Sequence, residues 1–568
     1  MDPICSEWIV GEDYSDFIAE YRTDTSELET TPNICFNIIN DTHAAVYTPT
    51  NLLVSNVLQT YGYSTYPKLY GLMDVPSLEA SGVQRLRNIP NLSLNGQGVI
   101  IGIIDTGIDY THDAFKNADG TTRIVSIWDQ SIQTGPAPPT YFYGTEYNRD
   151  QINEALTNSA PLSVVPSTDD LGHGTFLAGI AAGTPNLQNN FSGVVPFAEI
   201  VVVKLKQAKQ NLRAFYGVPS DAVAFQENDI MFGIRYLINA ARSLSRPISI
   251  CIGLGTSQGS HDGRGPLDSY LSYMADQAGI GIVIAAGNEG NTGHHFSGVI
   301  TRGGEQFNTV ELRIAPGVEG FTMELWGNAP GTFSIDILSP TGEYIPRIPA
   351  RIGETREIRF IFEETVINVD YLLLESQTGD QLIHVRFLNP TEGIWRFKVY
   401  ASGDLTSEYD IWLPISEFLS TDTHFVQPDP FYTITSPGDA SVPIVVTAYD
   451  HTNNSLYISA SRGYTRMDGI SPNFAAPGVN LIGPAAGNTY TTKSGTSIAA
   501  AHTAGITAML LEWGVTSGYY SQLDSIEIKN LLIRGARRDP NNTYPNRDWG
   551  YGMLDIYNTF NSLRGEQG

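Results

Sequence analysis

The sequence predicts an α/β fold in which helices cover both faces of a parallel sheet, with a small α+β unit before it and an antiparallel β insertion within it. Almost wholly apolar runs, as expected for parallel strands buried on both faces, occur at 99–104, 200–203, 248–252 and 280–284. Segments with helical periodicity, such as 228–243, lie between these runs. Between 297 and 435 apolar and polar residues alternate instead, which predicts an antiparallel, jelly-roll-like sandwich.

These changes of pattern divide the chain into four predicted parts. Residues 1–75 combine polar turns with short alternating stretches, which suits a small α+β domain. Residues 76–296 and 436–568 form the two parts of the α/β domain, and residues 297–435 form the insertion. The insertion contains no recognisable sugar- or metal-binding pattern, so we expect a rigid sandwich packed on the α/β domain rather than a binding module.

Composition excludes several classes of function. The 568 residues carry a formal net charge of −27, which disfavours a nucleic-acid partner. The three cysteines match no metal spacing, and Cys251 lies in an apolar run that predicts a buried strand. Residues 1–7 lack the basic start and apolar stretch of a signal peptide, and no uninterrupted apolar run approaches the ~20 residues of a membrane-spanning helix. We therefore expect neither a membrane partner nor export directed by this sequence.

Three segments place an acid, a histidine and a serine in the order known for one form of catalytic triad. Asp105 ends the first buried strand, His173 enters a helix between glycines, and Ser497 begins an apolar helix. A serine hydroxyl becomes a nucleophile when a histidine removes its proton, and a carboxylate holds that histidine in the correct tautomer. A helix N-terminus at Ser497 adds backbone donors for a developing oxyanion. We expect Asp105, His173 and Ser497 to be the catalytic residues.

A fourth segment suggests a further oxyanion donor. Asn288 follows the buried strand at 282–284 and ends the run Ala285-Ala286-Gly287-Asn288. A side-chain amide at the end of such a strand can donate a hydrogen bond to the oxyanion. We expect Asn288 to fill this role.

The four segments together resemble the subtilisin-like serine peptidases, or subtilases, over roughly 95–295 and 436–565. This resemblance implies a serine endopeptidase without a cofactor, acting on protein or peptide substrates. It also implies that an extended peptide binds along Gly253-Leu254-Gly255 and Ala285-Ala286-Gly287. The family's common calcium-loop pattern is not evident near 186–192, so no metal is inferred.

Two positions depart from the family pattern. Ala501 stands where the family usually has a proline before the histidine of the nucleophile helix, here His502. The separation of Asp105 and His173 (173 − 105 = 68) is long and implies a surface insertion around 117–168.

The N-terminal unit and the insertion narrow the resemblance to the Csp germination proteases of spore-forming clostridia. Those proteins cleave off a prodomain that stays bound, and they process the zymogen of a spore-cortex hydrolase. The resemblance implies self-cleavage in or near 70–77, a prodomain bound in the substrate cleft, and a cytoplasmic or spore-associated location in a bacterium. Two alternatives remain open, namely a non-catalytic scaffold or sensor with an occluded triad, and a broad degradative protease.

Other polar residues receive structural interpretations. His502 lies five positions after Ser497 and should point away from it on a helix, which predicts a packing or hydrogen-bonding role. Asp109 and Asp170 are expected to be loop and cap carboxylates. The pair His294-His295 is expected to lie in a solvated loop, because adjacent residues do not easily face one metal.

Overall fold

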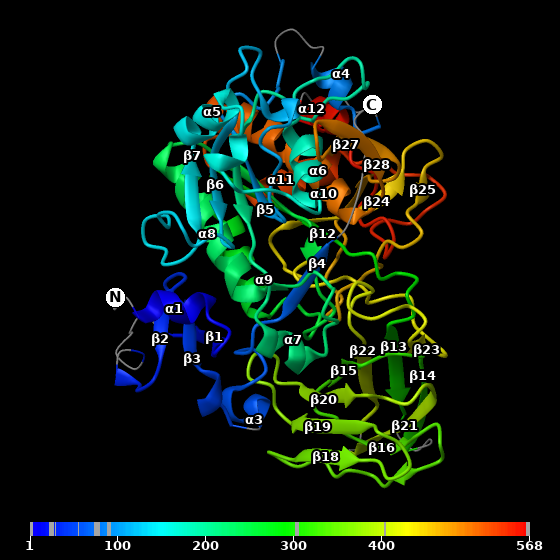
Figure 1. The fold of residues 1–568 in the computed structure, drawn as a ribbon. Helices are drawn as coiled ribbons and strands as arrows, with labels where there is room; N and C mark the ends of the chain where they lie inside the picture. The colour runs from blue at the N-terminus through cyan, green and yellow to red at the C-terminus, as the bar shows by residue number, and fades with distance from the viewer. Residues whose placement is uncertain are drawn as a thin grey trace.

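The computed structural model describes residues 4–21, 28, 30–54, 56–72, 80–87, 92–301, 306–402 and 405–563. It has three parts, which we call the N-terminal region (4–72), the α/β region (80–294 and 426–563) and the inserted region (295–425). In Figure 1 the α/β region lies at the top, with the N-terminal region and the inserted region beneath it. The division at residues 75, 296 and 435 that the sequence suggests stays a prediction.

The α/β region is built on a nine-stranded sheet whose main path is β25-β24-β12-β10-β5-β8-β6-β7. Its strands are β5 (Ile100–Asp105), β6 (Ile124–Asp129), β7 (Thr145–Asn148), β8 (Glu199–Lys204), β10 (Ile248–Ile252), β12 (Ile280–Ala285), β24 (Ile444–Asp450), β25 (Ser455–Leu456) and β26 (Phe474–Pro477). The strands from β24 to β6 along this path pair in parallel, and the edge strands β25 and β7 are antiparallel. Every residue of β5, β10 and β12 is buried, including the free thiol of Cys251, which confirms the predicted apolar strands.

Helices cover both faces of this sheet, as the sequence predicts. One face packs against α6 (His173–Ala182), α10 (Thr496–Leu511) and α11 (Ser525–Gly535), and the other against α8 (Glu227–Ser243) and α9 (Pro266–Ala275). The remaining elements of the region are α4 (Val83–Arg87), α5 (Arg149–Thr157), α7 (Gln210–Tyr216), β9 (Phe225–Gln226), β11 (Leu254–Gly255), α12 (Ile556–Leu563) and the hairpin β27 (Leu481–Ala485) and β28 (Thr489–Lys493).

Helix α10 and the π turn that continues it form a helix at Thr496–Thr516. Judged by length and composition only, this helix is long and apolar enough to cross a membrane. Among the described residues it is the one such helix, and 89% of its most apolar window is buried inside the protein. Packing in the core therefore accounts for its composition.

The segment 117–168 differs from the expected surface insertion. Ile124–Asp129 forms β6, which pairs in parallel with β8 inside the central sheet. Only the part that follows, with β7 and α5, extends the edge of the sheet. The long separation between Asp105 and His173 thus contains a core strand, whose apolar pattern is short and interrupted by Ser126.

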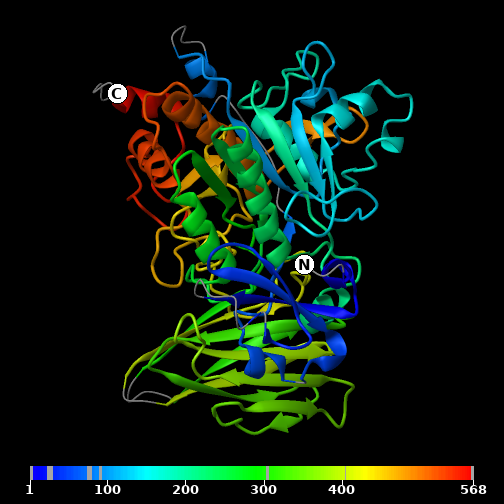
Figure 2. The same cartoon turned by 90° about the vertical axis from the view of Figure 1, so that its left-hand side faces the viewer.

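The N-terminal region contains a three-stranded antiparallel sheet with β3 in the centre. Its elements are α1 (Ile4–Val10), β1 (Tyr14–Glu20), β2 (Cys35–Ile38), β3 (His43–Pro49), α3 (Val57–Tyr61) and β4 (Leu69–Leu72). Figure 2 shows this region, in blue, lying against the α/β region above and the inserted region below. Asp16 anchors it, because its buried carboxylate pairs with Lys209 and accepts a hydrogen bond from Asn228 at 2.9 Å.

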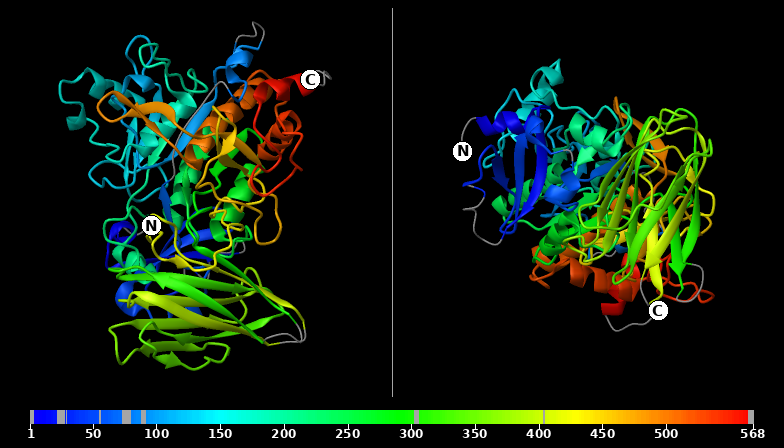
Figure 3. Two further views of the ribbon diagram at one scale, coloured as in Figure 1. Left: turned by 90° about the vertical axis from the view of Figure 1, so that its right-hand side faces the viewer. Right: turned by 90° about the horizontal axis from the view of Figure 1, so that it is seen from below.

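The inserted region is a sandwich of two antiparallel sheets, ordered β13-β22-β15-β20-β19-β18 and β17-β16-β21-β14-β23. Its strands are β13 (His295–Ile300), β14 (Phe307–Ile314), β15 (Gly320–Gly327), β16 (Thr332–Leu338), β17 (Tyr344–Ile345), β18 (Thr355–Arg359), β19 (Val366–Leu372), β20 (Gln381–Leu388), β21 (Gly393–Ser402), β22 (Ser407–Trp412) and β23 (His424–Phe425). The two layers are visible in Figure 3 and enclose a core of their own, with Trp395 and Phe397 among its members.

Both ends of the inserted region meet at one place on the α/β region. The backbone amide of Asp429 donates to the carbonyl of His295 at 2.9 Å, so the entering and leaving chains are hydrogen-bonded neighbours. Arg466 of the α/β region reaches across the junction and donates to Asn328 at 2.6 Å. The insertion is therefore joined to the α/β region by side chains as well as by its two chain connections.

Candidate active site

The structure brings Asp105, His173 and Ser497 together at the carboxyl edge of the parallel sheet. Asp105 is the last residue of β5, His173 the first residue of α6, and Ser497 the second residue of α10. Gly174 allows α6 to approach β5 closely, because a Cβ there would lie 2.2 Å from the carbonyl oxygen of Gly107. The predicted residue types thus meet because two helices begin where β5 ends.

The distances match a hydrogen-bonded relay. His173 Nδ1 lies 2.8 Å from Asp105 Oδ1, and His173 Nε2 lies 3.3 Å from Ser497 Oγ. A carboxylate can only accept, so the proton of the neutral imidazole sits on Nδ1 and Nε2 is left to accept from the serine hydroxyl. All three side chains are buried.

A second carboxylate, Asp169, supports this relay and was not singled out from the sequence. Its Oδ1 accepts from Thr106 Oγ1 at 2.7 Å, and its Oδ2 accepts from the backbone amide of Thr175 at 2.8 Å. Asp169 therefore ties the first turn of α6 to the residue after Asp105. Nothing in the sequence separates it from its exposed neighbour Asp170, since only the fold shows which of the two points inward.

Asn288 lies beside the start of α10, in an orientation that suits an oxyanion donor. Its Oδ1 accepts from the backbone amide of Thr496 at 3.2 Å and from Thr496 Oγ1 at 3.1 Å. These bonds fix the amide group by its oxygen, which leaves Nδ2 as the group that can donate toward a reacting carbonyl. The backbone amide of Ser497 at the helix N-terminus is the second available donor.

The segment Gly253–Gly255 lies next to the nucleophile and already pairs with a strand of the same chain. A Cβ at Gly253 would lie 3.0 Å from Ser497 Cβ, so glycine keeps this approach open. Strand β11 pairs antiparallel with β4, Leu254 opposite Leu72 and Gly255 opposite Gly71. On its other edge β4 pairs with β9, so the tail of the N-terminal region occupies the middle position of a three-stranded sheet.

The segment Ala285–Gly287, also expected to bind substrate, begins with the last residue of β12 and leads to Asn288. The amide of Gly287 donates to Thr496 Oγ1 at 3.2 Å. A Cβ at Gly287, whose φ is +107°, would lie 2.7 Å from Thr435 Oγ1. Among the described residues, Ala285, Ala286 and Gly287 make no strand pairing with β4, so their substrate-binding role stays a prediction.

On the other side of Ser497 the cleft opens into a cavity of 580 Å³. Its walls include His173 and Asn288 from the α/β region, and Glu417 and Thr421 from the inserted region. Glu289 bridges the two regions beneath it, because its Oε1 accepts from Ser416 N at 3.1 Å and from Ser416 Oγ at 2.9 Å.

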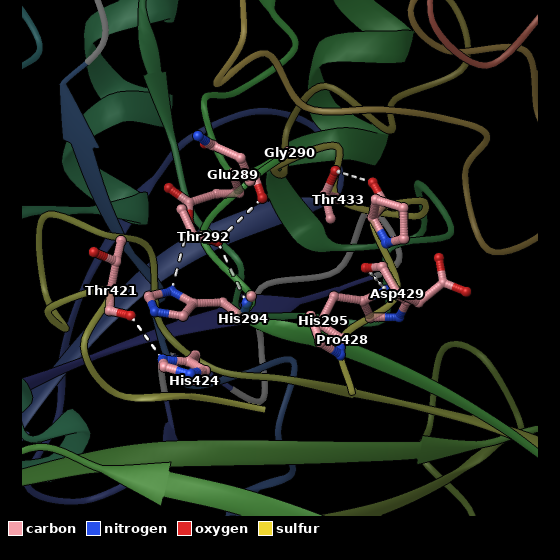
Figure 4. Close-up of a pocket in the computed structure, with 13 residues that line it drawn as sticks. Glu289, Gly290, Thr292, His294, His295, Thr421, His424, Pro428, Asp429 and Thr433 are labelled. Carbon is pink, nitrogen blue, oxygen red and sulfur yellow. Dashed lines mark hydrogen bonds and ion pairs between the residues drawn. The ribbon is translucent and has the colours of Figure 1, made fainter. Parts of the chain in front are cut away.

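A second cavity, of 570 Å³, shares Asn291, Thr292 and Thr421 with the first and is drawn in Figure 4. His294 and His295 line it and are buried, so the expectation of a solvated loop was wrong. They are buried because His295 begins β13 and His294 directly precedes it, at the junction with the inserted region, a position that local sequence does not reveal. Within the described part of the chain no cluster of three or more histidine, cysteine, aspartate or glutamate side chains is placed to hold a metal ion.

Of the other polar residues singled out from the sequence, His502 and Asp109 have structural contacts, whereas Asp170 is exposed and the carboxylate bonded to the first turn of α6 is Asp169 rather than the expected Asp170. His502 points away from Ser497, and its Nε2 lies 2.6 Å from Ser81 Oγ; burial lowers its pKa to about 3. Asp109 accepts from the hydroxyl of Thr111 at 2.6 Å within its own loop. The predicted hydrogen-bonding role of His502 and the predicted loop role of Asp109 are confirmed.

An acid, a histidine and a serine joined in this way at a helix N-terminus define a serine hydrolase site. A sequence model of the subtilase family matches residues 96–309 and 393–552. The chain belongs to the subtilase family.

Individual relatives agree with this assignment. The subtilisin-like protease SBT2.2 of Arabidopsis thaliana is 30% identical over 212 residues, covering 34% of this chain and 23% of that protein. Mycosin-3 of Mycobacterium tuberculosis is 28% identical over 184 residues, covering 32% of this chain and 36% of that protein. The matches thus span about a quarter to a third of these curated relatives.

A solved structure of the Clostridium perfringens CspB protease is similar over a much larger part of the chain. It is 32% identical, superposes with a TM-score of 0.76, and the match covers 86% of this chain and 97% of that one. This similarity supports the predicted fold class and the resemblance to the Csp proteases.

Proposed function

We propose that this protein is a serine endopeptidase that cleaves its own N-terminal region and then hydrolyses peptide bonds in a protein substrate. The observation that supports this most directly is the continuous Asp105–His173–Ser497 relay beside a cleft strand, β11, that already pairs with an extended segment of the same chain. Family membership supports the reaction class.

In the proposed reaction Ser497 Oγ attacks the peptide carbonyl while His173 Nε2 takes its proton. Asp105 holds His173 by Nδ1 and stabilises the imidazolium that forms. The amide of Asn288 and the backbone amide of Ser497 donate to the oxyanion. His173 then gives the proton to the leaving amine, and water hydrolyses the acyl-enzyme by the same steps in reverse.

The self-cleavage site is proposed to lie just after Leu72. Strand β4 ends at Leu72 opposite Leu254, one residue from Gly253, which contacts the nucleophile. The predicted range 70–77 overlaps this point, although residues 73–79 lie outside the described part of the chain. After cleavage the N-terminal region would stay docked, since Asp16 and Lys209 form a buried ion pair between the two regions.

The resemblance to the Csp proteases leads to the proposed physiological role, processing of a spore-cortex hydrolase zymogen during germination. One observation favours the alternative of a scaffold with an occluded triad. Ser497 is buried and β4 fills the cleft beside it, which is also the state expected of a peptidase with its cleaved tail in place.

Intact mass and N-terminal sequencing of the purified chain beside Ser497→Ala test the proposal. We expect the wild type to separate into two fragments with a new N-terminus within residues 73–79, and Ser497→Ala to stay whole. Wild-type protein that also stays whole would contradict the proposal and favour the scaffold. Activity on many unrelated proteins would instead favour a broad degradative protease.

A further inference from the structure

Residues 68–72 lie in the cleft as an extended peptide with partners on both edges. The amide of Glu227 donates to the carbonyl of Lys68 at 3.0 Å, Leu69 is paired with Gln226, and Leu72 is paired with Leu254. Because this segment precedes the proposed scissile bond, the side chains of Lys68 and Leu69 occupy positions that substrate side chains would take.

Lys68 is the basic residue of this segment, and its ammonium group is buried against a carboxylate. Its side-chain Nζ lies 3.5 Å from Glu227 Oε2 and 5.0 Å above the ring centre of Tyr63. Glu227 also accepts from the amide of Lys68 at 3.1 Å and from the amide of Leu267 at 3.2 Å. These backbone bonds hold the carboxylate in place independently of the lysine side chain.

A second buried carboxylate, Glu324 of the inserted region, is linked to the same ammonium group through Tyr63, which contacts both. Tyr63 OH donates to it at 2.6 Å, and the amide of Gly259 donates at 3.1 Å. Burial raises the pKa of Glu324, and its hydrogen bonds from Tyr63, Gly259 and Trp326 partly oppose this shift, as does, to a smaller extent, the positive charge of Lys68. Lys68, Glu227 and Glu324 are 4%, 1% and 2% exposed, so solvent screens their charges little.

We propose that Glu227 and Glu324 form an acidic subsite that selects a lysine or arginine in the substrate, at the position of Lys68. The inference rests on the proposed peptidase function and specifies its substrates. A neutral or acidic residue at this position would leave buried carboxylates without a counter-charge, which disfavours such substrates. The selected residue lies four positions before Leu72 (72 − 68 = 4), remote from the scissile bond.

Self-cleavage of the full chain tests the subsite, because position 68 belongs to its own cleaved segment. The rate is measured by intact mass after refolding for the wild type, Lys68→Gln, Glu227→Gln and the double variant. We expect Lys68→Gln to slow cleavage at least tenfold in the wild-type background and less than about threefold in the Glu227→Gln background. Lys68→Arg, which keeps the charge, should cleave within about threefold of the wild type.

The coupling between positions 68 and 227 separates selection from a general folding defect. Glu154→Gln, an exposed substitution on α5, is the matched control. In that background Lys68→Gln should slow self-cleavage by the same factor as in the wild-type background. Equal slowing by Lys68→Gln in every background, or slowing by Lys68→Arg as large as that by Lys68→Gln, would overturn the proposal. Absence of cleavage in the wild type would instead refute the proposed function itself.

Cleavage sites in an unfolded protein substrate, added in excess so that it displaces residues 68–72 of the cleaved N-terminal region from the cleft, give a second measurement that needs no change at Lys68. Sequencing the fragments released from reduced, carboxymethylated albumin should reveal lysine or arginine enriched at one fixed distance upstream of the cut. That distance should equal the one between Lys68 and the self-cleavage site, and Glu227→Gln should remove the enrichment. Cut sites with no basic residue enriched there would contradict the acidic subsite.

Discussion

The two sides of the cleft that meet at Ser497 differ in what occupies them. On one side, β4 lies between β9 and β11, with main-chain hydrogen bonds on both edges and Leu69 and Lys68 buried. On the other side, two cavities of 580 and 570 Å³ that share three lining residues lie open between the α/β region and the inserted region.

This difference bears on how substrate recognition would be distributed along the cleft of the proposed peptidase. The filled side uses strand pairing and buried charges, so it depends on an extended backbone and on a few fixed side chains. The open side is bounded by Thr421 and Glu417 of the inserted region, so its shape depends on how that region is docked. Both sides share one centre, formed by Asp105, His173 and Ser497.

The largest effect should come from Asp105→Asn, which acts on the shared centre. The amide cannot hold His173 in the tautomer that accepts from Ser497, so we expect the cleavage rate constant to fall about 10⁴-fold. Self-cleavage kinetics after refolding provide the measurement, with the exposed Asp170→Asn as the control. A fall of less than tenfold would show that Asp105 is not the orienting carboxylate.

Leu69→Ala should weaken the filled side alone. Leu69 is fully buried in a cluster with Tyr66 and Tyr216. Replacing it by alanine leaves a cavity and should destabilise this packing by about 2–5 kcal/mol. We expect the cleaved N-terminal region to dissociate at lower urea concentration, measured by size-exclusion chromatography. The exposed Leu52→Ala, also in the N-terminal region, is the control. Unchanged dissociation would mean that β4 adds little to docking.

Glu289→Gln should affect the open side alone. The substitution weakens two charge-assisted hydrogen bonds from Ser416, at a cost of about 1.5–3 kcal/mol in the free energy of unfolding. Calorimetry measures the loss, and retention of the N-terminal region should be unchanged. If that region dissociates more readily instead, the two sides are coupled and the comparison between them fails.

The smallest effect should be the pH dependence of stability that is caused by His502, whose Nε2 contacts Ser81 Oγ outside the cleft. Burial lowers the pKa of His502 to about 3, below the unfolded value of about 6.5, so the unfolded state binds more protons between these values. Stability should therefore fall as pH drops below 6.5, by about 1.4 kcal/mol at pH 5.5 from this group. Urea unfolding of the wild type and His502→Gln should show this difference. A gap between the two proteins that stays constant with pH would contradict it.

The parts of the molecule that could be predicted from sequence are those determined by local pattern. The buried strands follow from continuous apolar runs, and Asp105, His173 and Ser497 each lie at a strand end or helix start that the sequence marks. Strand β6 was not predicted because Ser126 interrupts its apolar pattern. In addition, α6 does not follow β6 directly, so the expected alternation of strand and helix is not visible at this point of the sequence.

The remaining features depend on contacts between distant segments. Asp169 and Asp170 are identical in type, and only the packing of α6 turns the first of them inward. The proposed acidic subsite joins positions 68, 227 and 324, which no periodicity connects. His294 was assigned to a solvated loop because nothing in its neighbours indicates the junction that buries it.

The hydrogen bond between Asp429 and His295 holds the two chain connections of the inserted region side by side. Because the chain leaves and re-enters the α/β region at adjacent points, a short linker could replace the whole sandwich without opening the central sheet. Such an excised protein would keep Asp105, His173 and Ser497 but would lose Glu324 from one side of the cleft and Glu417 from the other. Its removal would leave the central sheet paired as it is, but it would expose Leu69 and Tyr216, which pack in one cluster with Trp326 of the insertion, and would change both walls of the proposed substrate cleft.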